Sequence, residues 1–527
     1  MRNCVPAGWG AATLDELAGI VRGVTFPSSA KLAVPTDNSV ICLRTSNVQR
    51  QLEFGDVLHI SQTYVKREEQ WLQDGDTVIS MANSYELVGK VAYAKSPPPR
   101  TTIGGFISIV RSRGIDPRFL YYQLASTDVQ EEMRKTASTT VNISNLSLRG
   151  IRPLPLVVAP LPEQHRIVEA IESYLTRLDD AVASLERVQR NLERYRASVL
   201  KAAVEGRLVP TEADLARQEG RTYEPADVLL ERILAERKTR WIEDAAEKAR
   251  SKAEAKARKA DKPWTPEDDA KALEKAHKAA ETKYKEPAAP DLSASGAQAG
   301  TTDLPEGWCW ATADQLAYRV TDGEHQTPTR TESGIPLVSA RNVLNGQLSF
   351  ADVDFVSRET HLELCKRLAV AAGDVLLSCS GTVGRACVVP PGVEFSMVRS
   401  AAVLMPALPI GPYMEFGLRS PMLQEQIRRR KTETAQANIF QGKIKQLVFP
   451  LPPFAEQEHI TTRTGEYFAI AEHIEKGIKI AMAKCLRLRQ SILKWAFEGK
   501  LVEQDPDDEP ASVLLKRIQS EIPRVKR

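Results

Sequence analysis

The sequence predicts an α+β protein in which two mixed α/β modules are joined by two long antiparallel coiled-coil helices. Three observations predict this fold class. The chain repeats itself, which indicates a pseudo-two-fold organisation. Each repeat contains a long segment with the apolar spacing of a coiled-coil helix. A charged, alanine-rich segment, which we expect to be a helical insert, lies between the repeats.

The repeat is clear where each module begins. Residues 5–18 (VPAGWGAATLDELA) match residues 304–317 (LPEGWCWATADQLA). Both copies place a threonine three residues before Glu16 or Gln315, which predicts a capping box at the start of a helix.

The repeat is also clear after each module ends. APLPEQHRI (159–167) matches PPFAEQEHI (452–460), and RASVLKAAVEGRLV (196–209) matches RQSILKWAFEGKLV (489–502). The same number of residues separates the two blocks in both copies, so the helix that they bracket has one length.

Matches inside the modules are weaker and predict strands. DGDTVIS (74–80) resembles AGDVLLS (372–378), and each is a Gly-Asp turn followed by an aliphatic run, which is typical of a buried strand. ELVGKVAYA (86–94) and SGTVGRACVV (380–389) predict the strand that follows. We therefore expect one architecture with two diverged surfaces.

The segments 163–201 and 456–497 each predict one long helix. Their apolar residues follow a 4-3-4-3 spacing, which is the seam of a coiled coil. We expect the two helices to pack antiparallel, which would place the modules at opposite ends of a rod; the alternative is that each helix packs against its own module. The predicted seams are Ile167, Ile171, Tyr174, Leu178, Ala181, Leu185, Val188, Leu192, Tyr195 and Val199, and Ile460, Thr464, Tyr467, Ala471, Ile474, Ile478, Ala481, Cys485, Leu488 and Ile492.

The remaining segments complete a division of the chain. EPADVLLERI (224–233) recurs as EPASVLLKRI (509–518), so the tail belongs to the repeated unit. We expect a solvated charged hairpin in the insert, with a new helix starting at Thr265-Pro266. The predicted parts are the first module (1–160), the first long helix (161–209), the charged helical insert (210–286), a flexible linker (287–303), the second module (304–453), the second long helix (454–503) and the tail (504–527).

Composition excludes several classes of protein. No apolar run approaches the length of a membrane span, and the first residues lack the pattern of a secretory signal, so we expect a cytoplasmic protein. The seven cysteines are scattered without a CxxC pair, which argues against a zinc ribbon or a disulfide framework. The formal net charge of +3 does not by itself indicate a partner.

The sequence contains no recognisable catalytic signature. It lacks a phosphate-binding GxxxxGK[ST] loop, an HExxH motif, a nucleophile elbow and the Asn/Asp-Pro-Pro-aromatic motif of amino-methyltransferases. The histidines show no metal-ligand spacing. We therefore predict no catalytic residues and no metal site.

Basic side chains are the strongest candidates for binding, because Arg and Lys neutralise phosphates and Arg also pairs with guanine edges. For each one, a solvated surface charge is the alternative. The candidates for DNA binding are Arg44, Lys66, Arg67, Lys90, Arg111, Arg134, Lys135, Asn142, Arg341, Arg385, Arg428, Arg429, Arg430, Lys431 and Asn438. Further basic residues of the modules are Arg100, Arg113, Arg330, Arg358, Lys366, Arg367 and Arg399.

A basic run marks corresponding places in both modules. A short helix predicted at 421–427 ends in Arg428 to Lys431, and a polar segment (433–440) follows. In the first module Met133-Arg134-Lys135 precedes TASTTVNIS (136–144). Cations at a helix end are favoured by the helix dipole, but four exceed that need. We predict that the loops 134–144 and 428–438 face DNA.

These elements resemble the specificity subunit of type I restriction–modification systems, over nearly the whole chain. The resemblance rests on four motifs in order, twice: PxGW at 6–9 and 305–308, the Gly-Asp strand, the exit ending in EQ at 163–164 and 456–457, and the helix ending in EG(R/K)LV. The first exit lacks the PLPP of the second. The charged insert at 234–286 is a larger departure from the family's pattern.

The resemblance implies a function. In that family each module is a target-recognition domain that reads one half of a split double-stranded DNA site, in defence against phage. The paired helices fix the spacing of the halves and bind the methylation subunits, of which we expect two, beside restriction/translocase subunits. S-adenosylmethionine, ATP and Mg²⁺ are expected on those partners, with no cofactor on this chain. Two other classes stay open from the residues alone: a diverged DNA methyltransferase or nuclease, and a coiled-coil adaptor that does not bind DNA.

Overall fold

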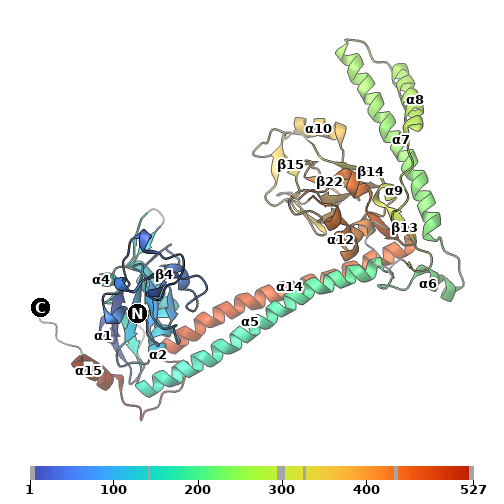
Figure 1. Cartoon of the computed structure of the whole chain (residues 1–527). Coiled ribbons are helices and arrows are strands. Elements are labelled where there is room, and N and C mark those ends of the chain that lie inside the picture. The colour runs from blue at the N-terminus through green and yellow to red at the C-terminus, as the bar shows by residue number, and fades with distance from the viewer. Residues whose placement is uncertain (1–5, 141–142, 293–302, 325–327, 433–436, 522–527) are drawn as a thin grey trace. The chain divides into compact units, whose positions relative to one another are not determined.

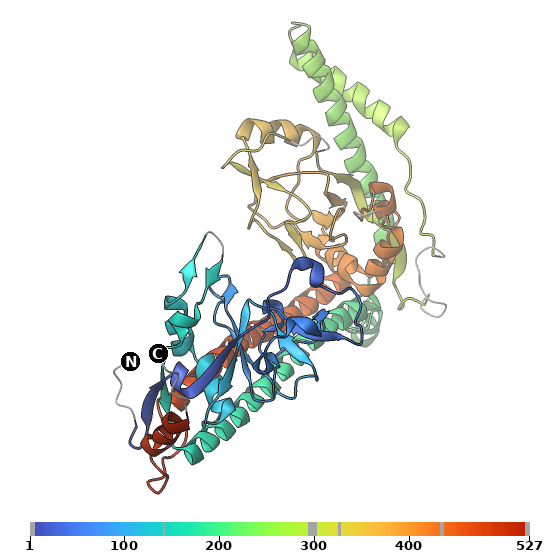
Figure 2. The same cartoon turned by 60° about the vertical axis from the view of Figure 1, so that its left-hand side comes forward.

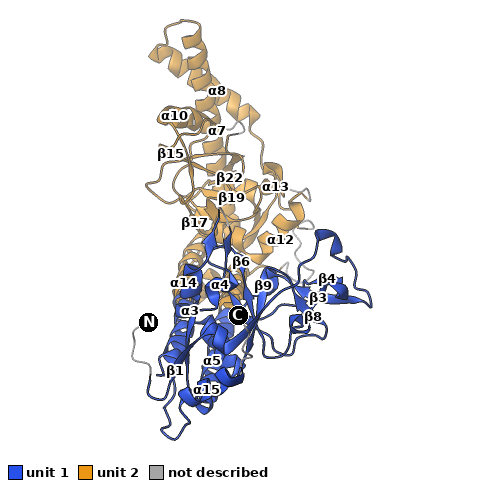
Figure 3. Ribbon diagram, turned by 90° about the vertical axis from the view of Figure 1, so that its left-hand side faces the viewer, with its two compact units in different colours: residues 1–188, 477–527 blue, residues 189–476 orange. Residues whose placement is uncertain are grey.

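The computed structural model describes residues 6–140, 143–292, 303–324, 328–432 and 437–521. The chain divides into two compact units, residues 1–188 with 477–527 and residues 189–476 (Figure 3). Unit 1 contains the first module and unit 2 the second. Each long helix contributes one part to each unit.

The first module is built on a four-stranded antiparallel sheet with the strand order β2-β9-β5-β7. A three-stranded sheet, β4-β3-β8, pairs β3 antiparallel with β4 and parallel with β8. All four residues of β5 are buried, as its aliphatic sequence predicts. The strands are β1 (Gly10–Thr13), β2 (Ala18–Arg22), β3 (Ser39–Leu43), β4 (Leu58–Ser61), β5 (Thr77–Ser80), β6 (Ala82–Asn83), β7 (Val91–Tyr93), β8 (Thr101–Ile103), β9 (Ile107–Ser112), β10 (Ser138–Thr139), β11 (Ser144–Asn145) and β12 (Pro155–Val158).

The second module repeats this topology. Its main sheet has the order β14-β22-β19-β20, its second sheet the order β18-β15-β21, and its first and last strands pair as β1 and β12 do. The predicted pseudo-repeat of two mixed α/β modules is confirmed. The strands are β13 (Cys309–Thr312), β14 (Ala317–Asp322), β15 (Ile335–Val338), β16 (Val343–Leu344), β17 (Gln347–Leu348), β18 (Asp354–Val356), β19 (Val375–Ser378), β20 (Ala386–Val388), β21 (Ser396–Met397), β22 (Ala401–Pro406) and β23 (Val448–Leu451).

Short helices cover these sheets, and the predicted capping boxes open α1 and α9. Pro421 begins α12, where the sequence predicts a helix. The helices of the modules are α1 (Leu14–Leu17), α2 (Pro117–Ala125), α3 (Thr127–Lys135), α4 (Leu148–Ile151), α9 (Ala313–Leu316), α10 (Arg358–Arg367), α11 (Gly411–Arg419), α12 (Pro421–Arg430) and α13 (Gln441–Lys445).

The two long helices are α5 (Leu161–Val204) and α14 (Phe454–Phe497). In unit 1, Ile167 and Ile171 share a core with Ile492 and Ala496. In unit 2, Ala203 shares a core with Ile460. Ion pairs continue the pairing, from Arg489 to Asp179 at 2.6 Å in unit 1 and from Arg196 to Glu475 at 3.0 Å in unit 2. Within each unit the helices therefore run side by side and antiparallel (Figure 1, Figure 2).

The seam of the helix pair differs from the predicted one at every second position of α5 from Tyr174 onward, whereas in α14 Ile474 alone of the predicted seam residues is exposed. Ile171, Leu178, Leu185 and Leu192 are buried or half-buried, but Tyr174, Ala181, Val188 and Tyr195 are exposed, and their neighbours Leu175, Val182, Gln189 and Arg196 are the less exposed residues. In α14 the same shift leaves Ile474 41% exposed, while Glu475 is half-buried. Apolar residues on the flank of the seam fit the 4-3 spacing equally well, which is why the sequence pattern misplaced it.

The insert is only partly a solvated hairpin. Its helices are α6 (Glu212–Glu219), α7 (Ala226–Lys259) and α8 (Pro266–Lys283), and α8 starts at the predicted cap. However, Ala226, Leu229 and Ile233 at the start of α7 are fully buried in the core of the second module. The first turns of α7 therefore belong to the module, because their Leu and Ile side chains complete its core.

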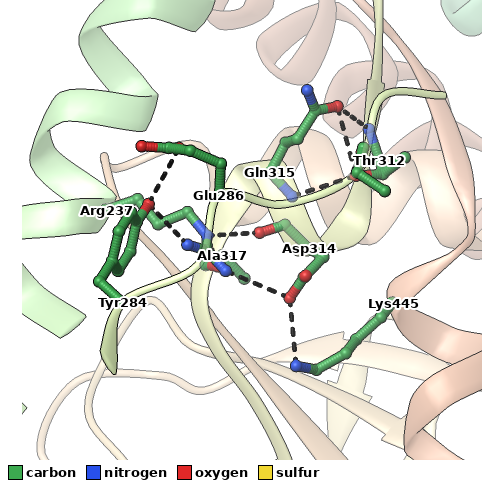
Figure 4. A network of polar contacts seen from close by, with 9 residues as sticks. Arg237, Tyr284, Glu286, Thr312, Asp314, Gln315, Ala317 and Lys445 are labelled. Carbon is green, nitrogen blue, oxygen red and sulfur yellow. Dashed lines mark hydrogen bonds and ion pairs between the residues drawn. The ribbon is translucent and has the colours of Figure 1, made fainter. Parts of the chain in front are cut away.

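A polar network fixes the rest of α7 to the second module (Figure 4). The guanidinium group of Arg237, 5% exposed, donates to the backbone oxygens of Asp314 and Ala317 and to the hydroxyl of Tyr284. Asp314 also pairs with Lys445 at 3.3 Å. Beyond this network α7 and α8 pack against each other.

In unit 1 the tail helix α15 (Ala511–Glu521) packs on the first module, as the start of α7 packs on the second. Ala511, Leu514 and Ile518 belong to the core of the first module. The repeated EPA-x-VLL-x-RI blocks therefore bury the same face, each on one module. None of the described helices has the length and apolarity needed to cross a membrane.

Candidate nucleic-acid interface

The recurrent motifs meet where each module joins its helix. Trp9 Nε1 donates a hydrogen bond to Glu163 at 2.9 Å, and Trp308 Nε1 donates to Glu456 at 3.1 Å. Glu456 also accepts the backbone N–H of Glu212 at 2.9 Å. The GW and EQ motifs recur together because they form this joint, which holds the edge of the module against the first turn of the helix.

The glutamates of the joint are buried. Burial raises the pKa of Glu456 to about 7, against the opposing effect of its N–H donors. Burial also raises the pKa of Glu163 above its usual range. Burial therefore outweighs the N–H donors, which favour the charged form and lower the pKa of each carboxyl group.

The basic candidates of the first module are in different settings. Arg111 is bound to the buried carboxylate of Asp76 at 2.7 Å, and Arg44 pairs with Asp56 at 2.7 Å. The ammonium group of Lys90 donates to Gln49, and Lys135 pairs with Glu132. Lys66 and Arg67 are exposed, Arg134 is half-buried, and none of these three forms an ion pair with a described residue. Asn142 lies outside the described residues.

The candidates of the second module are mostly engaged as well. Arg341 pairs with Asp354 at 2.9 Å, and Arg385 donates to the backbone oxygen of Ala340. Asn438 accepts a hydrogen bond from the hydroxyl of Ser380 at 2.5 Å.

The basic run at the end of α12 does not present four similar charges. Arg428 and Arg429 both bind Glu425, each at 2.7 Å. These two hydrogen-bonded arginines lower the pKa of Glu425 to about 2. Arg430 is half-buried, and Lys431 is exposed beyond the helix. The run is thus partly neutralised within its own helix.

Each module carries a cleft on its surface. In the first module a cleft of about 450 Å³ is lined by Phe26, Lys31, Arg44 and Phe106 among others. In the second a cleft of about 640 Å³ is lined by polar residues that include Ser380, Arg399, Asn438 and Gln441. Only Arg44 and Asn438 of these are predicted site residues. Of the others, Phe106, Ser380 and Gln441 lie in the segments GGF, SGTVG and NIFQG, whose side chains carry no strong signal in the sequence, and Arg399 is known from the sequence only as one basic residue among many.

The described part of the chain contains no group of three or more His, Cys, Asp or Glu side chains placed to hold a metal ion. What the modules do offer is cations, amides and hydroxyl groups in concave surfaces. Such groups bind phosphates and base edges of nucleic acids.

The fold defines a class of protein: two α/β modules of one topology, each joined to one of two paired long helices. Comparison with known proteins narrows this class. Residues 6–193 match the family model of the type I restriction modification DNA specificity domain. The specificity subunit of the type I restriction enzyme EcoKI from Escherichia coli (strain K12) is 24% identical over 540 residues, which cover 98% of this chain and 96% of the relative.

A second relative agrees with this match, and a solved structure shares the fold. The EcoBI specificity subunit of Escherichia coli is 25% identical over 401 residues, 73% of this chain and 68% of the relative. A structure described under "Structural basis underlying complex assembly and conformational transition of the type I R-M system" has a TM-score of 0.56 at 16% identity, over 95% of this chain and all of the other. Residues 6–193 thus match the type I restriction modification DNA specificity domain, and the chain over nearly its whole length is similar to specificity subunits of type I restriction enzymes.

Proposed function

We propose that this chain reads a bipartite DNA sequence, one half with each module, and catalyses no reaction itself. The observation that carries the proposal is the pair of modules with one strand order and one Trp–Glu joint but different residues in their clefts. A scaffold that is kept while the exposed side chains change is what two readers of different half-sites require.

The helices α5 and α14 have two roles in this proposal. They set the distance between the half-sites, and they bind methylation subunits. Their outer faces support the second role, because large apolar side chains there are exposed, and an exposed apolar surface favours a protein partner. These side chains are Tyr174, Val188 and Tyr195 of α5 and Ile470, Ile480, Leu486 and Trp495 of α14.

The chemistry of the complex is assigned to its partners. S-adenosylmethionine serves the methylation subunits, and ATP and Mg²⁺ serve the restriction subunits. The chain alone, incubated with DNA, S-adenosylmethionine and Mg²⁺, is then expected to neither methylate nor cleave. Methylation by the chain alone would overturn this part of the proposal.

A module exchange tests the reading of DNA. Residues 19–158 are replaced by the equivalent module of a relative, and the assembled methylation complex is assayed on a library of DNA sequences. One half of the methylated sequence is expected to change, while the other half and the spacing stay the same. A change in both halves, or in the spacing, would contradict the assignment of one half-site to each module.

A further inference from the structure

We propose that base edges of DNA bind in a cleft of the second module, and that Arg399 hydrogen-bonds to a guanine there. The cleft is formed by Ser380, Arg399, Asn438 and Gln441. This inference rests on the proposed function, since it states where in the second module the reading takes place. It assigns base recognition to residues away from the basic run at the end of α12.

The cleft is assembled from four separate segments. Asp322 ends β14, Ser380 follows β19, Arg399 lies in the turn before β22, and Asn438 and Gln441 lie at the approach to α13. Its polar groups are already oriented by one another. Ser380 Oγ donates to Asn438 Oδ1 and Gln441 Nε2 donates to Asp322 Oδ1, both at 2.5 Å. A preorganised surface loses little conformational entropy when it binds a ligand.

Arg399 differs from other exposed arginines of the second module. Arg341 pairs with Asp354, Arg358 with Glu394, and Arg428 with Glu425. The side chain of Arg399 is exposed and forms no ion pair with a residue that the structure describes. Its backbone is held, because its N–H donates to the carbonyl oxygen of Glu324 at 3.1 Å. The guanidinium group is thus available at the cleft on a fixed backbone.

The groups of the cleft match base edges better than phosphates. A phosphate needs only positive charge, whereas the cleft combines one cation with two amides, a hydroxyl and the carboxylate of Asp322. An arginine fork pairs with O6 and N7 of guanine, and Asn or Gln pairs with N6 and N7 of adenine. Phe440, which also lines the cleft, is 65% exposed and can contact a thymine methyl group.

The first module differs at the same place. The turn before β9 and the turn before β22 are closed by equivalent hydrogen bonds, Ile107 N–H to the oxygen of Gly104 and Ala401 N–H to that of Val398. The residues equivalent to Arg399 and Ser400 are therefore Gly105 and Phe106. The first module has no cation in this turn, so the two turns would read different bases.

The test uses the complete chain assembled with methylation subunits, on DNA in which every base pair of both half-sites is varied. Arg399→Ala is expected to reduce discrimination roughly tenfold to a hundredfold at one base pair of the second module's half-site, the range of one bidentate contact. Discrimination in the other half is expected to stay as in the wild type. Arg399→Lys keeps the charge but lacks the fork, so it restores the affinity more than the discrimination. Arg428→Ala, which also removes an exposed arginine, is expected to change affinity equally for all sequences.

A second variant fills the cleft without straining the backbone. A Cβ added to Gly442 meets no atom within 4 Å, and the residue lies in α13. Gly442→Gln is expected to weaken reading of the same half-site, and Gly442→Ala to do so much less.

Two results would overturn the inference: equal loss for all sequences with Arg399→Ala, which indicates a phosphate contact, or wild-type discrimination in both Arg399→Ala and Gly442→Gln. Either result leaves the proposed function intact if the wild-type complex still discriminates in both halves. Absence of discrimination in the wild-type complex would instead refute the proposed function.

Discussion

The two modules are alike where they are buried and different where they are exposed. Both have the same strand order, and both use a tryptophan and a buried glutamate to join the long helix. Their clefts differ in place and in lining: one lies beside β3 and β4 and is lined by Phe26, Lys31 and Phe106, and the other lies beside the end of β19 and α13 and is lined by Ser380, Arg399 and Gln441. The repeated sequence motifs therefore mark the scaffold, and the parts without a repeat are those that can carry specificity.

The largest effect is expected at the joint itself. Trp308→Ala should lower the free energy of unfolding of unit 2 by roughly 3–5 kcal/mol, because it removes a buried aromatic side chain and leaves a cavity. Trp9→Ala should lower the free energy of unfolding of unit 1 by less, about 2 kcal/mol, because Trp9 is only half-buried. Hydrogen exchange of the amides of each module measures the two units separately. Equal losses in both would show that burial does not set the strength of the joint.

The pH dependence of the joint is the next largest effect. The pKa of Glu456 is about 7 in the folded protein and lies near 4.5 when unfolded, so its stabilising contribution is complete below 4.5 and is lost as the pH rises through 7. The stability of unit 2 should therefore fall between pH 5 and pH 8, by on the order of 2 kcal/mol from this group.

The variant Glu456→Gln lacks this component and keeps an acceptor for Trp308. The stability of this variant relative to the wild type should therefore increase as the pH rises. Hydrogen exchange of unit 2 at pH 5 to 8 measures this difference. Glu163→Gln should act in the same direction in unit 1, since burial also raises the pKa of Glu163. Parallel pH curves for wild type and Glu456→Gln would contradict the raised pKa.

The sequence predicted the parts of the fold that depend on regular patterns. The helices 163–201 and 456–497, the capping boxes at Thr13 and Thr312, the helix start at Thr265 and the buried strands after Gly-Asp turns are all present. The helices and caps depend on the local spacing of residues. The strands depend on continuous apolar runs, which are buried in the core of a module.

Features that depend on tertiary pairing were not predictable. The seam of the helices includes Gln189, Arg196 and Glu475, because two helices alone leave seam positions half exposed, where polar side chains can pair. The start of α7 looked like part of a charged insert, but Leu229 and Ile233 complete the second module's core. For the site, the sequence identified cations but not their partners, such as the Asp76 that binds Arg111 or the Glu425 that binds Arg428.

A smaller effect distinguishes the two long helices. Thr464 is fully buried in α14, and its hydroxyl has no hydrogen-bond partner among the described residues, whereas the equivalent residue of α5 is Ile171. Thr464→Val keeps the shape and removes the unpaired hydroxyl, so unit 2 should become more stable by about 1 kcal/mol. Thr464→Ser keeps the hydroxyl and loses a methyl group, so it should be destabilising. A loss of stability in Thr464→Val, measured by thermal unfolding, would show that the hydroxyl is paired after all.

The smallest expected effect is at the basic run of α12, where the two modules differ in the number of charges. Neutralising Arg428, Arg429, Arg430 and Lys431 should weaken DNA binding by the assembled complex and reduce its salt dependence, by about one unit of slope for each phosphate that the complex no longer neutralises. Because Arg428 and Arg429 already share Glu425, we expect a reduction of about two units rather than four.

Glu425→Gln is the matched control: it releases both arginines and should strengthen binding and steepen the slope. Neutralising Arg134 and Lys135 tests the equivalent place in the first module, where only Lys135 has an acidic partner among the described residues. An unchanged slope in the four-residue variant would show that the run is a solvated helix end and that the second module meets DNA elsewhere on its surface.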